Sequence, residues 1–201
     1  FRFEGKHYQN RVVNPWAVPL QKPYPRVWVP GVISRETIVW AAEQRYPYIA
    51  LNTSIADTKK IWEVYDEVAA GVGYEAGPEN RGYLIQVHVS DNEEKAIENG
   101  QTSFEQQLED MRIIAGTPDT VVPKLRKILE ETRPGILALW GNDGAVSQAD
   151  SMTCIKMIGQ EVFPAIREIA KELDLKSPFE AEAPVHLRYS KDLKAPVAAA
   201  E

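Results

Sequence analysis

The sequence predicts an α/β fold in which βα units build a parallel sheet. Four short apolar runs occur along the chain, and each is followed by a stretch whose apolar residues have helical spacing. Glycine or polar turn residues stand between them. Strands that alternate with helices are typical of parallel sheets. Four such units cannot close an eight-stranded barrel, so the pattern leaves a doubly wound sheet and half of a barrel as the two possible architectures.

The elements can be assigned in order from the first residue. Residues 1–13 indicate a hairpin, and the prolines between residues 15 and 25 favour an extended connector. The predicted strands are residues 26–31, 48–53, 82–90 and 135–141. The predicted helices are residues 34–45, 57–71, 92–99, 103–114, 117–132 and 151–173. Thr117 suits an N-cap and Pro118 a first helical position, while Pro123 is expected to distort the first turn of the same helix.

Composition narrows the classes of function. Of the 201 residues, 44% are hydrophobic and 26% are charged, which is ordinary for a globular chain with a sizeable core. The net charge of −6, without a concentrated basic stretch, argues against nucleic-acid and anionic-membrane partners. No apolar run reaches the roughly 18 residues of a membrane span. The single Cys154 fits a reducing compartment, so we expect a cytoplasmic protein. Because the chain begins with Phe1 rather than Met, we expect a segment to be missing upstream.

Three stretches of the chain carry motifs of one enzyme family. Residues 14–51 are similar to a connector with a P-x-Q-K-P-x-P run, followed by a strand, a Gly/Ser turn and an Ala-Ala helix. Residues 113–131 are similar to a G-x-P-(D/E)-x-V helix start, and residues 136–166 to a last strand, loop and closing helix. In this order and spacing, over about residues 1–173, the chain resembles the bacterial-luciferase-like flavin-dependent monooxygenases.

The resemblance implies a (β/α)8 TIM-type barrel with a flavin at the C-terminal ends of its strands, of which only about the last four βα units are present. Residues 1–26 would be an extended or hairpin connector, residues 27–173 the C-terminal half of the barrel, and residues 174–201 an extended tail. The family's usual catalytic His belongs to the absent half, so no catalytic residue is transferred to this chain.

The strongest candidate for cofactor binding is the turn formed by residues 31–35. Gly31, at the end of a parallel strand, allows the backbone to approach a ligand, and the helix that follows offers N–H groups and the positive end of its dipole. Ser34 can cap that helix or donate to a phosphate, and Arg35 can pair with one. In the family the matching turn contacts the FMN phosphate. Val32 and Ile33 depart from its usual small residues, which leaves Ser34 as the best-matched hydroxyl.

A second candidate is His88, in the third predicted strand. Alternation along that strand places Gln86 and His88 on one face and the apolar Ile85 and Val87 on the other. In a barrel the apolar face packs on helices, so His88 is expected to face the lumen near the catalytic end. It could contact flavin or substrate there, or it could be a hydrogen-bonded residue of a polar layer.

Strand ends supply weaker candidates, because barrel active sites lie there. Asn52 and Thr53 follow the second strand, and Trp140, Asn142 and Asp143 follow the fourth, although Asn142 and Asp143 also suit a simple turn. No group of His, Cys, Asp and Glu has metal-ligand spacing, so no metal site is predicted.

The resemblance therefore predicts that the parent protein uses reduced FMN and O₂ to oxygenate a small organic substrate. Two alternatives stay open: an oxidoreductase of the same fold that uses the deazaflavin F420, and a non-catalytic flavin-binding or structural fragment. Because a half barrel exposes two sheet edges, the chain also predicts a partner for them: the missing N-terminal half or another chain. We expect the parent to be a homo-oligomer.

Overall fold

A computed structural model describes residues 2–14, 19–20, 25–100, 111–141, 144 and 146–179. The chain divides into two units, with a boundary between Arg26 and Val27. Before that boundary lies a short antiparallel hairpin of β1 (Phe3–Glu4) and β2 (Gln9–Asn10). Within it the Gly5 N–H donates to the Tyr8 carbonyl over 2.8 Å. The second unit contains the sheet and all the helices described below.

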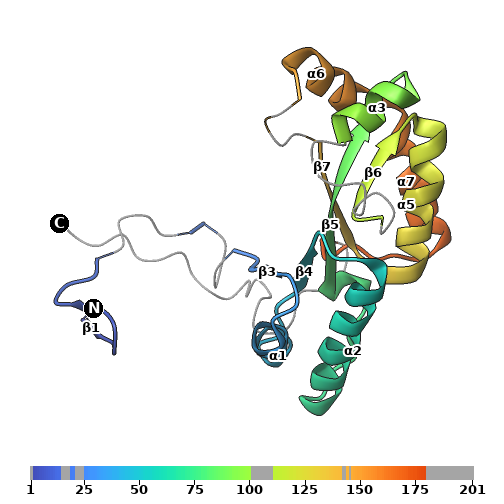
Figure 1. Ribbon diagram of the computed structural model, residues 1–201. Helices are drawn as coiled ribbons and strands as arrows, with labels where there is room; N and C mark the ends of the chain where they lie inside the picture. Colours follow the sequence, from blue (N-terminus) through green and yellow to red (C-terminus); the bar gives the residue numbers. More distant parts are fainter. Residues whose placement is uncertain are drawn as a thin grey trace. The chain divides into compact units, whose positions relative to one another are not determined.

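A parallel sheet of five strands forms the centre of the second unit (Figure 1). The strands are β3 (Val29–Gly31), β4 (Tyr48–Leu51), β5 (Arg81–Val89), β6 (Ile113–Gly116) and β7 (Ile136–Trp140). The long β5 pairs with β4 along its first half and with β6 along its second half. Both β4 and β6 pair with the same edge of β5. The Leu84 carbonyl accepts from the Asn52 N–H, which follows β4, and the Ser90 N–H donates to the Gly116 carbonyl of β6. Leu84 and Ser90 are an even number of residues apart, so their backbone groups point to the same side of the strand. The opposite edge of β5 pairs with β7.

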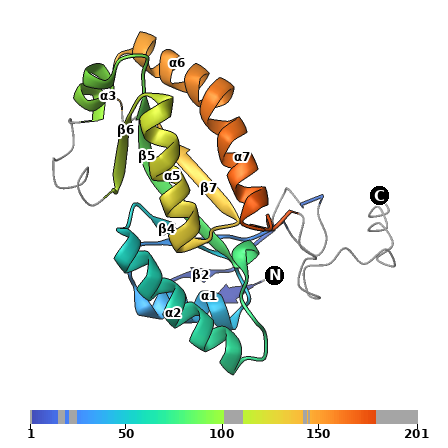
Figure 2. The same ribbon diagram turned by 90° about the vertical axis from the view of Figure 1, so that its right-hand side faces the viewer.

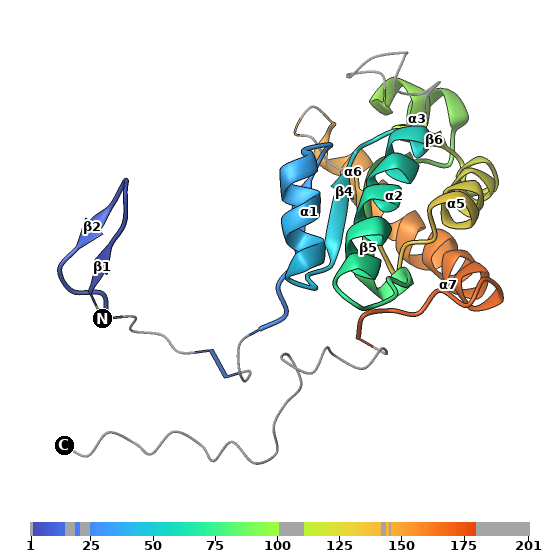
Figure 3. The same ribbon diagram turned by 90° about the horizontal axis from the view of Figure 1, so that it is seen from below.

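Helices follow the strands and pack on the sheet. They are α1 (Arg35–Glu43), α2 (Ile55–Gly71), α3 (Glu93–Gly100), α5 (Pro118–Thr132), α6 (Gln148–Met157) and α7 (Phe163–Glu172). A 3₁₀ turn, Pro78–Asn80, precedes β5, and a π-helical segment, Ile158–Val162, joins α6 to α7. Neighbouring helices contact in the order α1, α2, α5 and α7. Figure 2 shows α5 and α7 side by side, and Figure 3 shows α1 beside α2.

The two faces of the sheet differ in burial. Tyr83, Ile85 and Val87 of β5 are fully buried against the helices, whereas Leu84 and Gln86 between them are only partly buried. The same alternation occurs in β4, where Tyr48 and Ala50 are fully buried and the residues after each are not. One face therefore carries the core under the helices, and the other face is partly open among the described residues.

One predicted element is wrong. Helical spacing was expected over residues 103–114, but residues 113–116 form strand β6; residues 103–110 lie outside the described part of the chain. Ile113, Ile114 and Ala115 are all buried, because the second half of β5 extends beyond β4 and offers them a free edge. Packing on both faces of a strand explains a continuous apolar run, which periodicity cannot distinguish from a short buried helix.

Candidate functional site

Parallel strands bring all their C-terminal ends to one edge of the sheet, and Gly31 ends β3 there. Its immediate role is in packing. A side chain at this position would begin within 3 Å of the Tyr48 Oη and 3.0 Å from Cζ of the same buried ring. Gly31 therefore lets β3 lie directly against Tyr48, whether or not it also allows a ligand to approach.

Ser34 is the N-cap of α1. Its Oγ accepts from the Thr37 backbone N–H at 3.5 Å and from Thr37 Oγ1 at 3.1 Å, and it donates to Glu36 Oε2 at 3.1 Å. The capping interpretation of this residue is thus realised in the structure, and the phosphate contact stays a prediction. Thr37, which the sequence analysis did not single out, places a second hydroxyl beside Ser34.

Opposite charges flank this helix start. Arg35, the first residue of α1, is exposed. Glu36 is exposed as well, and a hydrogen bond from its own backbone N–H lowers the pKa of its carboxyl, with further help from the Ser34 hydroxyl. The turn therefore offers one guanidinium and two hydroxyls to an anion, while the ionised Glu36 competes for the same donors.

His88 lies on the partly open face of the sheet by register, since it has the alternation of Leu84 and Gln86 and pairs with Ala115. It is nevertheless only 4% exposed, and it has a partner within the protein. The apolar residues expected on the opposite face, including Ile85 and Val87, are fully buried there. This burial favours the polar-layer interpretation of His88, and a role in catalysis stays a prediction.

The end of β4 is a tightly organised corner. Asn52 has a left-handed backbone conformation, with φ of 49°, and its buried Oδ1 has no hydrogen-bond partner. Thr53 is buried; its Oγ1 lies 2.7 Å from Thr58 Oγ1, and its carbonyl accepts from the Tyr83 hydroxyl at 2.5 Å. A strained backbone and an unsatisfied polar atom, as at Asn52, are common at functional sites. The polar groups of Thr53, in contrast, are occupied by hydrogen bonds to Thr58 and Tyr83.

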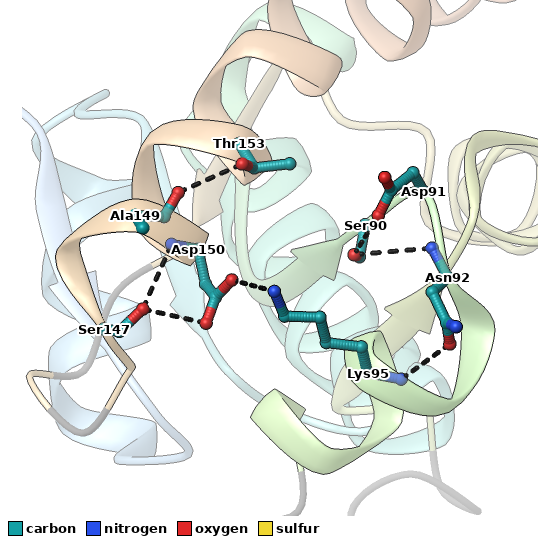
Figure 4. A network of polar contacts seen from close by, with 8 residues as sticks. All are labelled: Ser90, Asp91, Asn92, Lys95, Ser147, Ala149, Asp150 and Thr153. Atoms are coloured by element: carbon teal, nitrogen blue, oxygen red, sulfur yellow. Dashed lines mark hydrogen bonds and ion pairs between the residues drawn. The ribbon is translucent and has the colours of Figure 1, made fainter.

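After β5 and β7, polar contacts connect the helices that follow these strands, α3 and α6 (Figure 4). Lys95 of α3 forms an ion pair with Asp150 of α6, and this contact lowers the pKa of Asp150 and raises that of Lys95. Ser147 caps α6 through the Asp150 N–H at 3.2 Å. Asn142 and Asp143 lie outside the described residues, whereas Trp140, at the end of β7, is 51% exposed.

Glu93 of α3 completes this arrangement. Thr117 occupies the N-cap position of α5 as predicted, but its side chain does not cap the helix. Instead the Glu93 carboxylate accepts from the Thr117 N–H at 2.8 Å and from the Thr120 hydroxyl at 3.0 Å, and the first of these bonds chiefly lowers its pKa. Pro123 lies inside α5, and the helix continues beyond it to Thr132.

The free edge of β5 beyond β7 is closed by a side chain. The Val89 N–H donates to Cys154 Sγ at 3.3 Å, and the thiol lies 3.7 Å from the Val87 carbonyl that it donates to. Burial raises the pKa of Cys154. Among the described residues no cluster of three or more His, Cys, Asp or Glu could hold a metal ion, and no helix there is long and apolar enough to cross a membrane.

No protein-family model matches the sequence, and no curated protein matches it either. Solved structures do. Monooxygenase RslO1 from Streptomyces bottropensis matches with a TM-score of 0.70 at 16% identity, over 83% of this chain and 56% of that one. The oxygenating constituent of 3,6-diketocamphane monooxygenase from Pseudomonas putida, solved with FMN, matches with a TM-score of 0.62 at 17% identity, over 82% and 58%.

A third similar structure is the coenzyme F420-dependent tetrahydromethanopterin reductase from Methanopyrus kandleri, with a TM-score of 0.59 at 19% identity, over 81% of this chain and 57% of that one. The chain thus spans rather more than half the length of the proteins it matches. At these identities the likeness concerns the fold. It confirms the predicted architecture: the chain has the fold of part of a luciferase-like (β/α)8 barrel.

Proposed function

We propose that this chain is part of a flavin-dependent monooxygenase that uses reduced FMN and O₂ to oxygenate a small organic substrate. The main support is the fold, which it shares with two monooxygenases, one of them solved with FMN. In this proposal residues 27–173 are the C-terminal half of the barrel, and the protein is cytoplasmic.

The turn at the start of α1 is where the residues fit the cofactor's phosphate. Arg35 would supply the charge, and Ser34 and Thr37, whose hydroxyls lie 3.1 Å apart, would supply neutral donors. To donate to a phosphate, the Ser34 hydroxyl would have to turn away from Glu36. When bound, reduced flavin supplies the electrons that activate O₂; the protein's part is to hold the ring and exclude water.

A partner must cover the two outer strands of the half barrel. Among the described residues β3 pairs only with β4, and β7 pairs only with β5, so each leaves one edge without a strand. We infer that the missing half of the barrel, or another chain, pairs with them, and that the parent protein is a homo-oligomer.

Cofactor titration tests the proposal. FMN added to the purified protein should bind, with the flavin's two visible absorption bands retained, and the reduced complex should consume O₂. An F420-dependent oxidoreductase is the second candidate, because the reductase from Methanopyrus kandleri has a similar fold. Binding of F420 in preference to FMN would select it, and binding of neither cofactor by the parent protein would refute both and leave the non-catalytic alternative.

A further inference from the structure

The helix-facing side of β7 is less covered than that of the neighbouring β5. Register places Leu137 beside Tyr83 and Leu139 beside Ile85. Tyr83 and Ile85 are fully buried under the helices, whereas Leu137 and Leu139 are only partly buried. Side chains that lie next to each other on one face of a sheet pack against the same layer, so the layer over β7 is incomplete among the described residues.

A groove between β7 and α7 opens above these two leucines. Its volume is about 220 Å³. Most of its walls are apolar side chains, which include Leu137 and Leu139 of β7, Phe163, Ile166 and Ala170 of α7, and Leu175. The groove lies on the flank of α7 that is turned away from α5. On the opposite flank Glu172, roughly two and a half turns after Phe163, pairs with Arg126 of α5 over 2.8 Å.

The same flank continues from α7 onto α6 as an exposed apolar stripe. Met152 is 59% exposed, Ile155 is 60% exposed, and Phe163 at the start of α7 is 41% exposed. Together with Gly159 and Ala170 these residues recur at helical spacing, which places them on one side of the helical path. Figure 2 shows that α6 and α7 form one continuous path. From Met152 to Ala170 the stripe is about 27 Å long, which is the length of a helix and exceeds that of a small ligand.

The end of this flank at the C-terminus of α7 is basic. Arg167, Lys171 and Lys176 line a second cavity, of about 530 Å³, that adjoins the groove at Arg167. Two carboxylates offset part of this charge: Asp174 lines the same cavity, and Glu168 pairs with Lys171 over 2.7 Å. One positive charge remains, so this end favours an occupant that brings carboxylates or the negative end of a helix dipole.

We propose that this groove and stripe are the docking surface for the first βα unit of the missing half of the barrel. The strand of that unit pairs with the free edge of β7 and places its helix-facing apolar side chains in the groove. Its helix lies beside α6 and α7, with an apolar stripe of its own against Met152, Ile155 and Phe163. Because the helices of a βα barrel run in one direction, the C-terminus of that helix lies beside Arg167 and Lys176.

Two observations favour this occupant over a second copy of the chain or a small apolar ligand. The groove adjoins β7, which pairs only with β5 among the described residues, so one added strand both satisfies the open edge and fills the groove. The chain also covers only 56% of RslO1 and 58% of the diketocamphane monooxygenase, so each of them contains chain that has no counterpart here. The inference rests on the half-barrel part of the proposed function, and it names the surface and chemistry of the partner.

Thiol labelling tests this docking surface without any flavin. Met152→Cys places a thiol on the stripe, and Val72→Cys, at the end of α2 where the side chain is 39% exposed, is the matched control. The single natural cysteine, Cys154, is buried and gives little background. Each variant is labelled with a maleimide in two forms: the present chain, and the parent protein that includes the segment encoded upstream of Phe1.

In the present chain both introduced thiols should react at similar rates. In the parent protein Met152→Cys should react roughly tenfold more slowly or less, because the docked unit covers it, whereas Val72→Cys should stay within about twofold of its rate in the chain. Arg167→Glu gives a second measurement. It should lower the Tm of the parent protein by roughly 1–3 °C and leave the Tm of the chain unchanged, since only the parent brings a helix end to this charge.

Each other outcome overturns the proposal. If Met152→Cys reacts equally fast in both forms, nothing docks on the stripe. If it is already protected in the present chain, either a second copy covers it, and the protection rises with protein concentration, or the chain covers it by itself. An upstream segment that contains no βα unit would also refute the proposal. Titration of the parent protein with FMN decides the proposed function separately, because the labelling requires no cofactor.

Discussion

Replacing Gly31 with Ala places a methyl group against Tyr48. The new Cβ would lie within 3 Å of Tyr48 Oη, 3.0 Å from Cζ and 3.3 Å from Cε2. The ring has little room to withdraw, because it is fully buried and packs edge-on against Trp62, with centroids 6.4 Å apart. Either β3 must move outward or the ring must leave its position.

The cost follows from this geometry. Overpacking a buried site by one methyl group costs roughly 1–3 kcal/mol, and a rigid neighbour excludes the lower part of that range, so we expect about 2 kcal/mol. For a chain of this size that free energy lowers Tm by about 4–8 °C. Gly71→Ala is the matched control, because a methyl group at Gly71 meets nothing within 4 Å. It should leave the stability unchanged or raise it slightly.

Tyr48→Phe separates the steric cause from other effects. The Tyr48 hydroxyl is buried without a hydrogen-bond partner, so its removal should be neutral or stabilising. In the Phe background the nearest atom to the new methyl is Cζ at 3.0 Å, and Gly31→Ala should then cost less than about 1 kcal/mol. Urea unfolding of the four proteins in the cycle gives the coupling energy, expected to be about 1–2 kcal/mol. Additivity within about 0.5 kcal/mol would refute the steric explanation.

Three further outcomes are expected. Cys154→Ala should destabilise the protein by about 2 kcal/mol in urea unfolding, because the Val89 N–H loses its acceptor and a small cavity opens. Burial raises the pKa of Tyr83 to about 12 from an ordinary 10, so the unfolded chain ionises first, and roughly 2 kcal/mol of stability should be lost as pH rises from 10 to 12. Tyr83→Phe should remove this contribution to the loss of stability between pH 10 and 12. If the stability of the variant has the same pH dependence as that of the unmodified protein, Tyr83 is not the group responsible. Glu36→Gln should strengthen FMN binding roughly two- to fivefold, with riboflavin unaffected, since it removes a negative charge beside the predicted phosphate position.

The sequence predicted the parallel βα architecture because the apolar runs and helical periods are strong and local. It missed β6, since a doubly buried strand and a buried helical turn have the same apolar signature. The sequence does not show that β5 extends beyond the end of β4. This extension leaves the edge of β5 with which Ile113 and Ile114 pair.

The candidate site was predictable only in part. The sequence located the turn after β3, yet Gly31 has a packing role that depends on Tyr48, a residue 17 positions away. Thr37 was missed because a threonine inside a predicted helix carries no signal until its hydroxyl is seen beside Ser34.

Two residues of the short helix α3, Glu93 and Lys95, fasten the first turns of α5 and α6. The starts of α5 and α6 are thus held next to α3 by side chains as well as by the chain that connects the helices. Loss of Glu93 or Lys95 would therefore release the first turn of α5 or of α6 from α3, although neither residue belongs to the helix that it holds.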